Sequence, residues 1–132
     1  MEQLDWVGNK TSSITTSGFH NNSTHERQEV DYYATDPIAL EKLLAVEQFE
    51  NVWECACGEG HLSEVLKAHG IHGKSSDLID RGYGEVLDFL HNDIDWQGDI
   101  ITNPPYRLAT EFVYKAIDTL KQGRKVAMIF PQ

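Results

Sequence analysis

The sequence predicts an α/β fold built on a doubly wound, mostly parallel sheet, and three observations carry this prediction. Short apolar segments of strand length alternate with amphipathic segments of helix length. A glycine-rich turn, C-G-E-G at residues 57–60, joins the first apolar segment to the amphipathic segment after it. The apolar run at residues 99–103 leads into N-P-P-Y, which places a polar motif where open sheets of this class bind ligands.

Capping residues and periodicity then locate the individual elements. Asp36 followed by Pro37 predicts the start of a helix that runs to about residue 48. A later helix is expected over about residues 106–121, with Gly123 as its stop. Its apolar side comprises Leu108, Phe112, Val113, Ala116, Ile117 and Leu120. Five strands are predicted, at about residues 51–57, 73–78, 88–94, 99–103 and 125–130.

Composition limits the functions that the chain can perform. Its 132 residues, 40% of them hydrophobic, predict one globular core over residues 31–132, preceded by a polar, flexible arm at residues 1–30. A net charge of -10 has the wrong sign for neutralising phosphates, so nucleic-acid binding by this chain alone should be weak. No stretch has the length of a membrane span or signal peptide, which predicts a cytoplasmic protein without membrane contact. The two cysteines, Cys55 and Cys57, have no second pair with which to form a metal site, and none is expected.

The N-P-P-Y motif at residues 103–106 indicates chemistry on a planar amino group. Pro104 and Pro105 lack N–H donors, so this turn can present carbonyl oxygens to a ligand. The side-chain oxygen of Asn103 and the carbonyl oxygen of Pro104 are positioned to accept both hydrogens of an exocyclic amine, while Tyr106 stacks on its ring. Such contacts draw the nitrogen lone pair out of conjugation and prepare it for alkylation.

The glycine turn and the acids after it indicate a nucleoside-containing cofactor. The pattern from Gly58 is not a dinucleotide fingerprint, because Ser63 stands where the third glycine belongs. Asp77 lies 19 residues after Gly58 (77 − 58), close to the offset of about 20 at which a carboxylate meets ribose hydroxyls. Further along, Asp93 is expected to accept a hydrogen bond from an adenine amino group, and Ile94 to pack on the purine.

Four motifs in this order resemble those of class I S-adenosylmethionine-dependent methyltransferases, in the branch that methylates N6 of adenine in DNA. They are D-Y-Y-A-T-D-P at 31–37, E-C-A-C-G-E-G at 54–60, S-S-D-L at 75–78 and N-P-P-Y at 103–106. The resemblance implies a Rossmann-like core, S-adenosylmethionine as cofactor and DNA as partner. Cys55 stands where family members usually have proline, a mild departure because cysteine is small and apolar.

By this resemblance each candidate site residue has an implied role. Those expected around the methionine end of the cofactor are Tyr33, Thr35 and Glu54, and those in the loop beneath it are Ala56, Gly58 and Gly60. Asp77 would hold the ribose, and Asp93 with Ile94 the adenine. The residues implied in catalysis are Asn103, Pro104, Pro105 and Tyr106.

The resemblance also implies alternatives and a missing part. The same motif serves glutamine N5 methylation in proteins and amino methylation in ribosomal RNA, and a cofactor-binding remnant without catalysis is a third alternative. The family sheet has seven strands, whereas five are expected here. We therefore expect residues 125–130 to form an apolar sheet edge that either mediates self-association or is covered by a complementary chain.

Overall fold

In the computed structural model, which describes residues 36–130, five parallel strands form one sheet in the order β3-β2-β1-β4-β5. The strands are β1 (Val52–Glu54), β2 (His72–Asp77), β3 (Glu85–Val86), β4 (Ile100–Thr102) and β5 (Val126–Met128). This arrangement confirms the predicted doubly wound α/β sheet, and every ladder in it is parallel. The expected arm at residues 1–30 lies outside the described residues, as do Tyr33 and Thr35.

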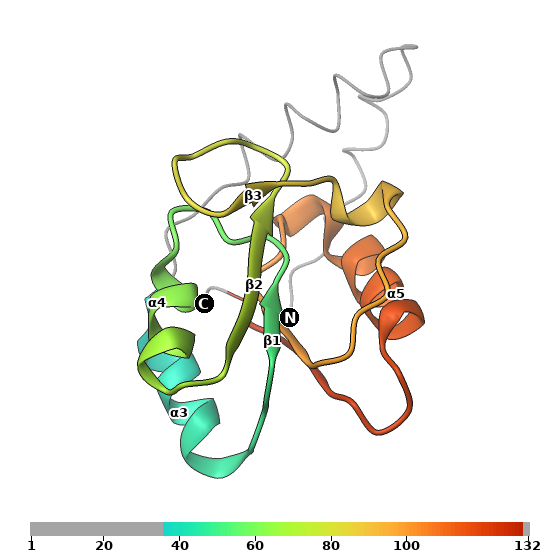
Figure 1. Cartoon of the computed structure of the whole chain (residues 1–132). Helices are drawn as coiled ribbons and strands as arrows, with labels where there is room; N and C mark the ends of the chain where they lie inside the picture. The colour runs from blue at the N-terminus through green and yellow to red at the C-terminus, as the bar shows by residue number, and fades with distance from the viewer. Residues whose placement is uncertain (1–35, 131–132) are drawn as a thin grey trace.

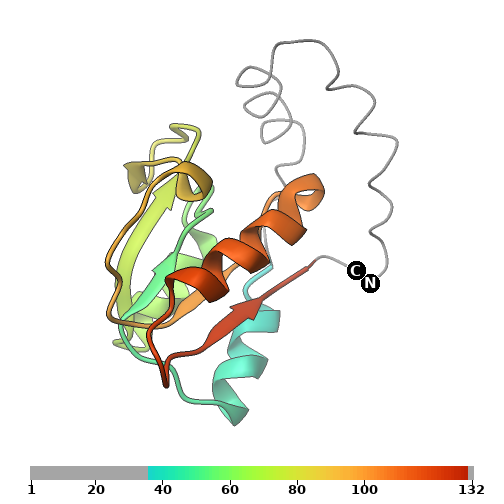
Figure 2. The same cartoon turned by 90° about the vertical axis from the view of Figure 1, so that its right-hand side faces the viewer.

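Helices cover both faces of the sheet (Figure 1). On one face lie α3 (Ile38–Val46) and α4 (His61–Ala68), and on the other lies α5 (Ala109–Thr119), which is preceded by the short helix η3 (Tyr106–Leu108). Figure 2 shows α5 crossing the sheet beside β5. Adjacent residues of the central strands point to opposite faces, with Trp53 and Ile100 in the α5 core and Val52 and Ile101 in the α3–α4 core. Both faces of β1 and β4 are therefore buried, as in parallel sheets generally.

Three sequence-based predictions about the elements need correction. The strand expected at 88–94 is β3 at Glu85–Val86, and Phe89–His91 instead form the short helix η2. Gly82 and Gly84 adopt left-handed backbone conformations, and they form the turn that precedes Glu85. The Asp88 side chain caps η2 by accepting a hydrogen bond from the Leu90 amide. The first strand ends at Glu54, so Cys55 and Cys57 lie in the turn rather than on the strand.

The later helix also differs from its prediction. The segment begins as η3 and continues as α5, which ends at Thr119, before Gly123. Ile117 was expected on the buried side but is 58% exposed, whereas Leu108, Phe112 and Ala116 are buried as predicted. Near the start of the described chain, Asp36 accepts a hydrogen bond from the Ile38 amide at 3.0 Å. The helix begins at Ile38 with Pro37 at the N-cap position, one residue later than predicted.

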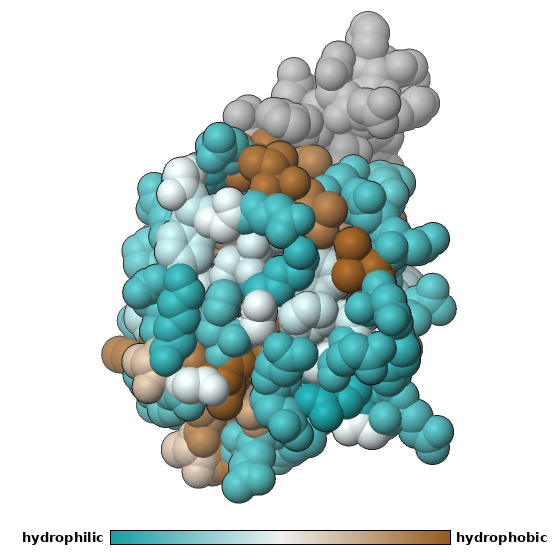
Figure 3. Space-filling model, viewed as in Figure 1, coloured by the Kyte–Doolittle hydropathy of each residue, from teal (hydrophilic) through white to brown (hydrophobic). Residues whose placement is uncertain are grey.

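The surface is mostly hydrophilic on the face drawn in Figure 3, and apolar residues gather in two places. One lies over α3, a helix that exposes Ile38 and Val46, and the other lies at the top of the view in the region of β3. Within residues 36–130, none of the helices combines the length and apolar character that crossing a membrane requires.

Candidate functional site

The glycine turn after β1 is held by an acid at the end of β2. Asp77 is buried, and its Oδ2 accepts the Gly58 N–H at 2.8 Å, while its Oδ1 accepts the Ile79 N–H at 3.0 Å. The turn then passes through Gly60, whose φ of +93° belongs to the left-handed region that favours glycine, and α4 begins at the next residue. The structure thus brings together Gly58, Gly60 and Asp77, as the sequence predicted.

A buried carboxyl group lies directly below this turn. Glu54, the last residue of β1, is 1% exposed and accepts a hydrogen bond from the Thr102 hydroxyl at the end of β4. Burial raises the pKa of Glu54 to about 8, and the nearby charge of Asp77 adds to the increase. Hydrogen bonds from the Thr102 hydroxyl and from the backbone amides of Asn103 and Ala56 lower the pKa and so offset part of this increase. Thr102 also accepts the Ala56 N–H at 3.1 Å, so it joins the two motifs.

The N-P-P-Y motif follows β4, which lies beside β1 in the sheet. Pro104 and Pro105 are buried, and Asn103 and Tyr106 are partly exposed. The Pro105 carbonyl accepts the Leu108 N–H at 3.0 Å and so starts η3, which leads into α5. Because the Asn103 amide faces Glu54, the glycine-turn motif and the N-P-P-Y motif meet at one carboxyl edge of the sheet.

The residues expected at the adenine have their contacts elsewhere. Asp93 is fully exposed and forms an ion pair with Lys115 of α5 at 3.0 Å. Ile94 packs against the core beneath α5. Both line a cavity of about 360 Å³ that also includes Asp95, Asp118 and Lys121. No described contact joins Asp93 or Ile94 to the glycine turn, and their proposed role stays a prediction.

Sequence reasoning missed two residues at the carboxyl edge. Asp88 is the first acid after β3, and it follows Leu87, whose amide donates to the Asp77 carbonyl at 2.9 Å. Its carboxylate accepts the Leu90 amide and pairs with His91 Nδ1 at 2.8 Å. The spacing of Gly82 and Gly84 could have placed the strand earlier and so identified this acid. Thr102 gave no sequence signal, because its partner Glu54 is 48 residues away.

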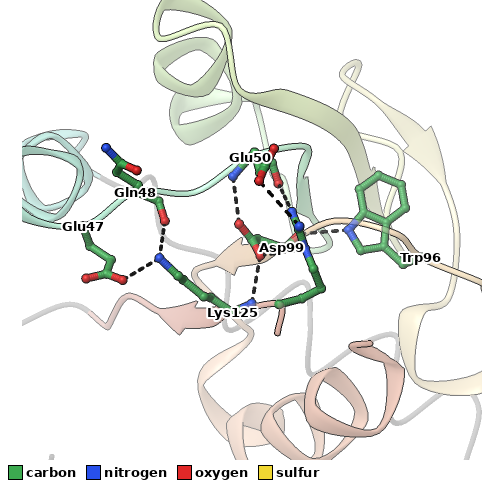
Figure 4. Close-up of polar contacts among 7 residues, drawn as sticks. Glu47, Gln48, Glu50, Trp96, Asp99 and Lys125 are labelled. Carbon is green, nitrogen blue, oxygen red and sulfur yellow. Dashed lines mark hydrogen bonds and ion pairs between the residues drawn. The ribbon is translucent and has the colours of Figure 1, made fainter. Parts of the chain in front are cut away.

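The opposite, amino edge of the sheet holds a different polar cluster (Figure 4). Asp99 is buried, and its carboxylate accepts the amides of Glu50 and Lys125 at 2.8 Å each. Arg124 Nε lies 3.2 Å from the same carboxylate. A cavity of about 460 Å³ lies beside this cluster, and two of the side chains that line it, Lys125 and Glu47, form an ion pair at 2.6 Å. The cluster therefore joins the starts of β1, β4 and β5.

Comparison of the chain with protein-family models, with curated proteins and with solved structures found no match. Among residues 36–130, no group of three or more His, Cys, Asp and Glu side chains is arranged to hold a metal ion.

Proposed function

We propose that this protein binds S-adenosylmethionine at the carboxyl edge of the sheet and transfers its methyl group to N6 of adenine in DNA. The observation that carries the proposal is the position of the two motifs. In the order β3-β2-β1-β4-β5 the direction of winding changes between β1 and β4, and such switch points are where open α/β sheets bind ligands. The glycine turn follows β1 and N-P-P-Y follows β4.

The residues at this edge fit a cofactor that carries an ammonium group and a ribose. Glu54 and Asp77 are both buried, and their described hydrogen bonds come from the Thr102 hydroxyl and from backbone amides. The ammonium group of a bound cofactor would pair with Glu54, which would release its proton to solvent on binding. Asp77 retains lone pairs for ribose hydroxyls, because each of its oxygens accepts one backbone amide. Asp88 is a further candidate acceptor for the adenine, beside the predicted Asp93.

In the reaction the chain's own residues orient and polarise the target amine. S-adenosylmethionine, when bound, supplies an electrophilic methyl group whose sulfonium departs as a thioether. Asn103 and the Pro104 carbonyl accept the two amine hydrogens and direct the nitrogen lone pair towards that methyl group. The nitrogen–carbon bond forms as the sulfur–carbon bond breaks, and the amine then releases a proton to solvent. An adenine in a duplex must first be flipped out of the stack onto Tyr106.

Calorimetric titration with S-adenosylmethionine tests the first half of the proposal. We expect measurable binding that Asp77→Ala weakens by about tenfold or more, because ribose contacts and the support of Gly58 are both lost. Glu41→Ala is the matched control, since Glu41 is an exposed acid on α3. If the folded protein shows no binding, the proposal is wrong.

Methyl transfer to an adenine-containing oligonucleotide tests the second half. Asn103→Ala should reduce the rate of transfer far more than cofactor affinity, because its proposed contacts are with the target amine. Tyr106→Ala should chiefly weaken engagement of the flipped base, since such stacking contributes about 1–3 kcal/mol per base. An equal loss of cofactor binding in both variants would contradict these roles.

Methylation of a protein amide is the second candidate, and the net charge of -10 favours it over a polyanionic substrate. Glutamine N5 presents the same planar pair of hydrogens to Asn103 and Pro104. A glutamine-containing peptide in the same transfer assay separates the two candidates. Transfer to the peptide but not to DNA would replace the first proposal by the second.

Self-association through β5 remains part of the proposal. Within residues 36–130, β5 lies at the edge of the sheet beyond β4, and Val126, Ala127 and Met128 are half-buried. Exposed strand edges pair readily with other strands. Sedimentation across a concentration series should show a reversible increase in mass, and a monomer at all concentrations would contradict this expectation.

A further inference from the structure

The segment between β2 and β3 folds back onto the glycine turn. It leaves β2 after Asp77 and reaches β3 at Glu85, and in Figure 1 it forms the loop above the carboxyl ends of these strands. Tyr83 lies near the end of this segment, and the sequence-based prediction assigned it to no site. Tyr83 contacts the turn on one side and α4 on the other.

The ring of Tyr83 occupies the space beside Gly60. A Cβ atom added to Gly60 would lie 2.6 Å from Cδ1 and Cε1 of the ring and 2.7 Å from Cζ. Gly60 is also the residue at which the turn becomes α4, and it adopts a φ of +93°. Glycine is therefore required here for two reasons, the backbone conformation and the approach of Tyr83.

Three further contacts hold Tyr83 in this position. Its hydroxyl donates to Oε2 of Glu64 in the first turn of α4 at 2.6 Å. Lys67 Nζ lies 4.8 Å from the ring centroid, within the range of a cation–π interaction. The Tyr83 carbonyl accepts a weak hydrogen bond from Cys57 Sγ at 3.6 Å. Tyr83 thus contacts Cys57, Gly60 and α4, which together frame the turn.

The backbone around Tyr83 is adapted to this contact. Gly84 has a φ of +72°, and a Cβ atom there would lie 2.9 Å from both Cys57 Sγ and the Ser75 carbonyl oxygen. The segment therefore approaches the turn more closely than any side chain at position 84 would allow. Gly82 has a φ of +84° and open space around it, so glycine is favoured at this position only by the backbone conformation.

We propose that Tyr83 is a positioning residue that clamps the glycine turn in the conformation that receives the cofactor. The clamp acts through Gly60 and α4 and holds the amides of Gly58 and Gly60 in fixed directions. Because this inference rests on the proposed function of the turn, its test needs one measurement that does not depend on a ligand. Amide hydrogen exchange of the turn in the ligand-free protein is that measurement.

The first experiment compares Tyr83→Ala, Tyr83→Phe and the control Tyr114→Ala, which removes a tyrosine that is 71% exposed on α5. In Tyr83→Ala we expect exchange at Gly58 and Gly60 to be about tenfold faster and the affinity for S-adenosylhomocysteine to fall by about tenfold. Tyr83→Phe keeps the ring and loses one hydrogen bond to an exposed partner, so it should change affinity by about threefold or less. Tyr114→Ala should change neither quantity.

The second experiment is a double-mutant cycle between Gly60→Ala and Tyr83→Ala, read by urea denaturation. The added methyl group strains the left-handed backbone in both backgrounds, but it collides with a ring only where Tyr83 is present. Gly60→Ala should therefore destabilise the wild-type protein more than it destabilises the Tyr83→Ala variant. Equal effects in the two backgrounds would show that Tyr83 does not pack on Gly60.

The outcomes separate this inference from the proposed function. If the protein does not bind the cofactor, the proposed function fails, and hydrogen exchange and the cycle still decide whether Tyr83 clamps the turn. If the cofactor binds and Tyr83→Ala leaves both exchange and affinity unchanged, the clamp is overturned. A gain of affinity in Tyr83→Ala would also overturn it, because the ring would then occupy the site instead of shaping it.

Discussion

Asp99 and Glu54 are both buried acids, and they lie at opposite ends of adjacent strands with opposite surroundings. At the amino edge, Asp99 accepts hydrogen bonds from two backbone amides and forms an ion pair with the guanidinium of Arg124. At the carboxyl edge, Glu54 accepts hydrogen bonds from the Thr102 hydroxyl and from backbone amides, and burial raises its pKa to about 8. The first acid is paired with a cation within the described fold, whereas the contacts described for the second are hydrogen bonds.

This difference separates a structural acid from a candidate binding acid. A buried charge that the fold already neutralises stabilises the strand starts that it joins. Burial favours the protonated, neutral form of a carboxyl group such as Glu54, and a positive group on a ligand would favour the ionised form, so binding would release the proton to solvent. Substitutions at the two positions should therefore affect different properties, stability at Asp99 and affinity at Glu54.

The largest effect is expected for Asp99→Ala. Removing this carboxylate leaves two partly buried amides without an acceptor and Arg124 without its buried partner, so the free energy of unfolding should fall by about 3 kcal/mol. Urea denaturation measures this change. A loss below about 1 kcal/mol would show that the cluster is not structural.

Glu54→Gln should chiefly lower affinity for the cofactor, with little loss of stability. The amide keeps the size of the side chain and a hydrogen bond with Thr102, so at about pH 4, where Glu54 is largely protonated in the folded and unfolded chains alike, stability should change by less than about 1 kcal/mol. At neutral pH the variant should be the more stable protein, because only the unfolded wild-type chain gains free energy by releasing the Glu54 proton. Affinity for S-adenosylmethionine should fall by about thirtyfold, because the negative partner of the ammonium group is gone. Calorimetry and denaturation on the same samples test both parts. A stability loss as large as that of Asp99→Ala would remove the contrast between the two acids.

The pH dependence of stability sharpens the comparison further. Between the ordinary pKa of 4.5 and the raised value of about 8, folded Glu54 keeps a proton that the unfolded chain has released. The free energy of unfolding should therefore decrease as pH rises through this window, by about 1.4 kcal/mol per pH unit for this group, and the decrease should end above about pH 8. Glu54→Gln should remove that contribution. Identical pH profiles of the variant and the wild type would show that Glu54 has no raised pKa.

The smallest effect is expected at the rim of the amino edge. Lys125→Met removes the ion pair with Glu47 but keeps the Lys125 backbone amide that donates to Asp99. Since both side chains of the pair are substantially exposed, stability should fall by less than about 1 kcal/mol, and less at high salt. Thermal denaturation at two salt concentrations measures this. A loss of stability comparable with that of Asp99→Ala would mean that the exposed ion pair stabilises the cluster as much as Asp99 does.

Much of the carboxyl edge was predictable from local sequence. The turn at Gly58 and Gly60, the acid at Asp77 and the motif at Asn103 each follow a recognisable strand, and parallel strands bring their carboxyl ends to one edge. The third strand was placed too late because its two residues, Glu85 and Val86, are exposed and give no apolar run. Asp88, the acid that follows this strand, was therefore assigned no role.

The sequence by itself determined the alternation of strands and helices, the glycine turn and the motif after β4. These features depend on the spacing of apolar residues, on helix caps and on turn residues, all of which act over a few neighbouring positions. Only the tertiary structure decided that the buried Asp99 lies beside Arg124 and that the buried Glu54 lies beside Thr102. Thr102 reaches Glu54 across 48 residues, Lys125 reaches Asp99 across 26, and Tyr83 covers Gly60 from a different loop. Each of these contacts depends on which strand lies beside which, and that order is set by packing of the whole sheet.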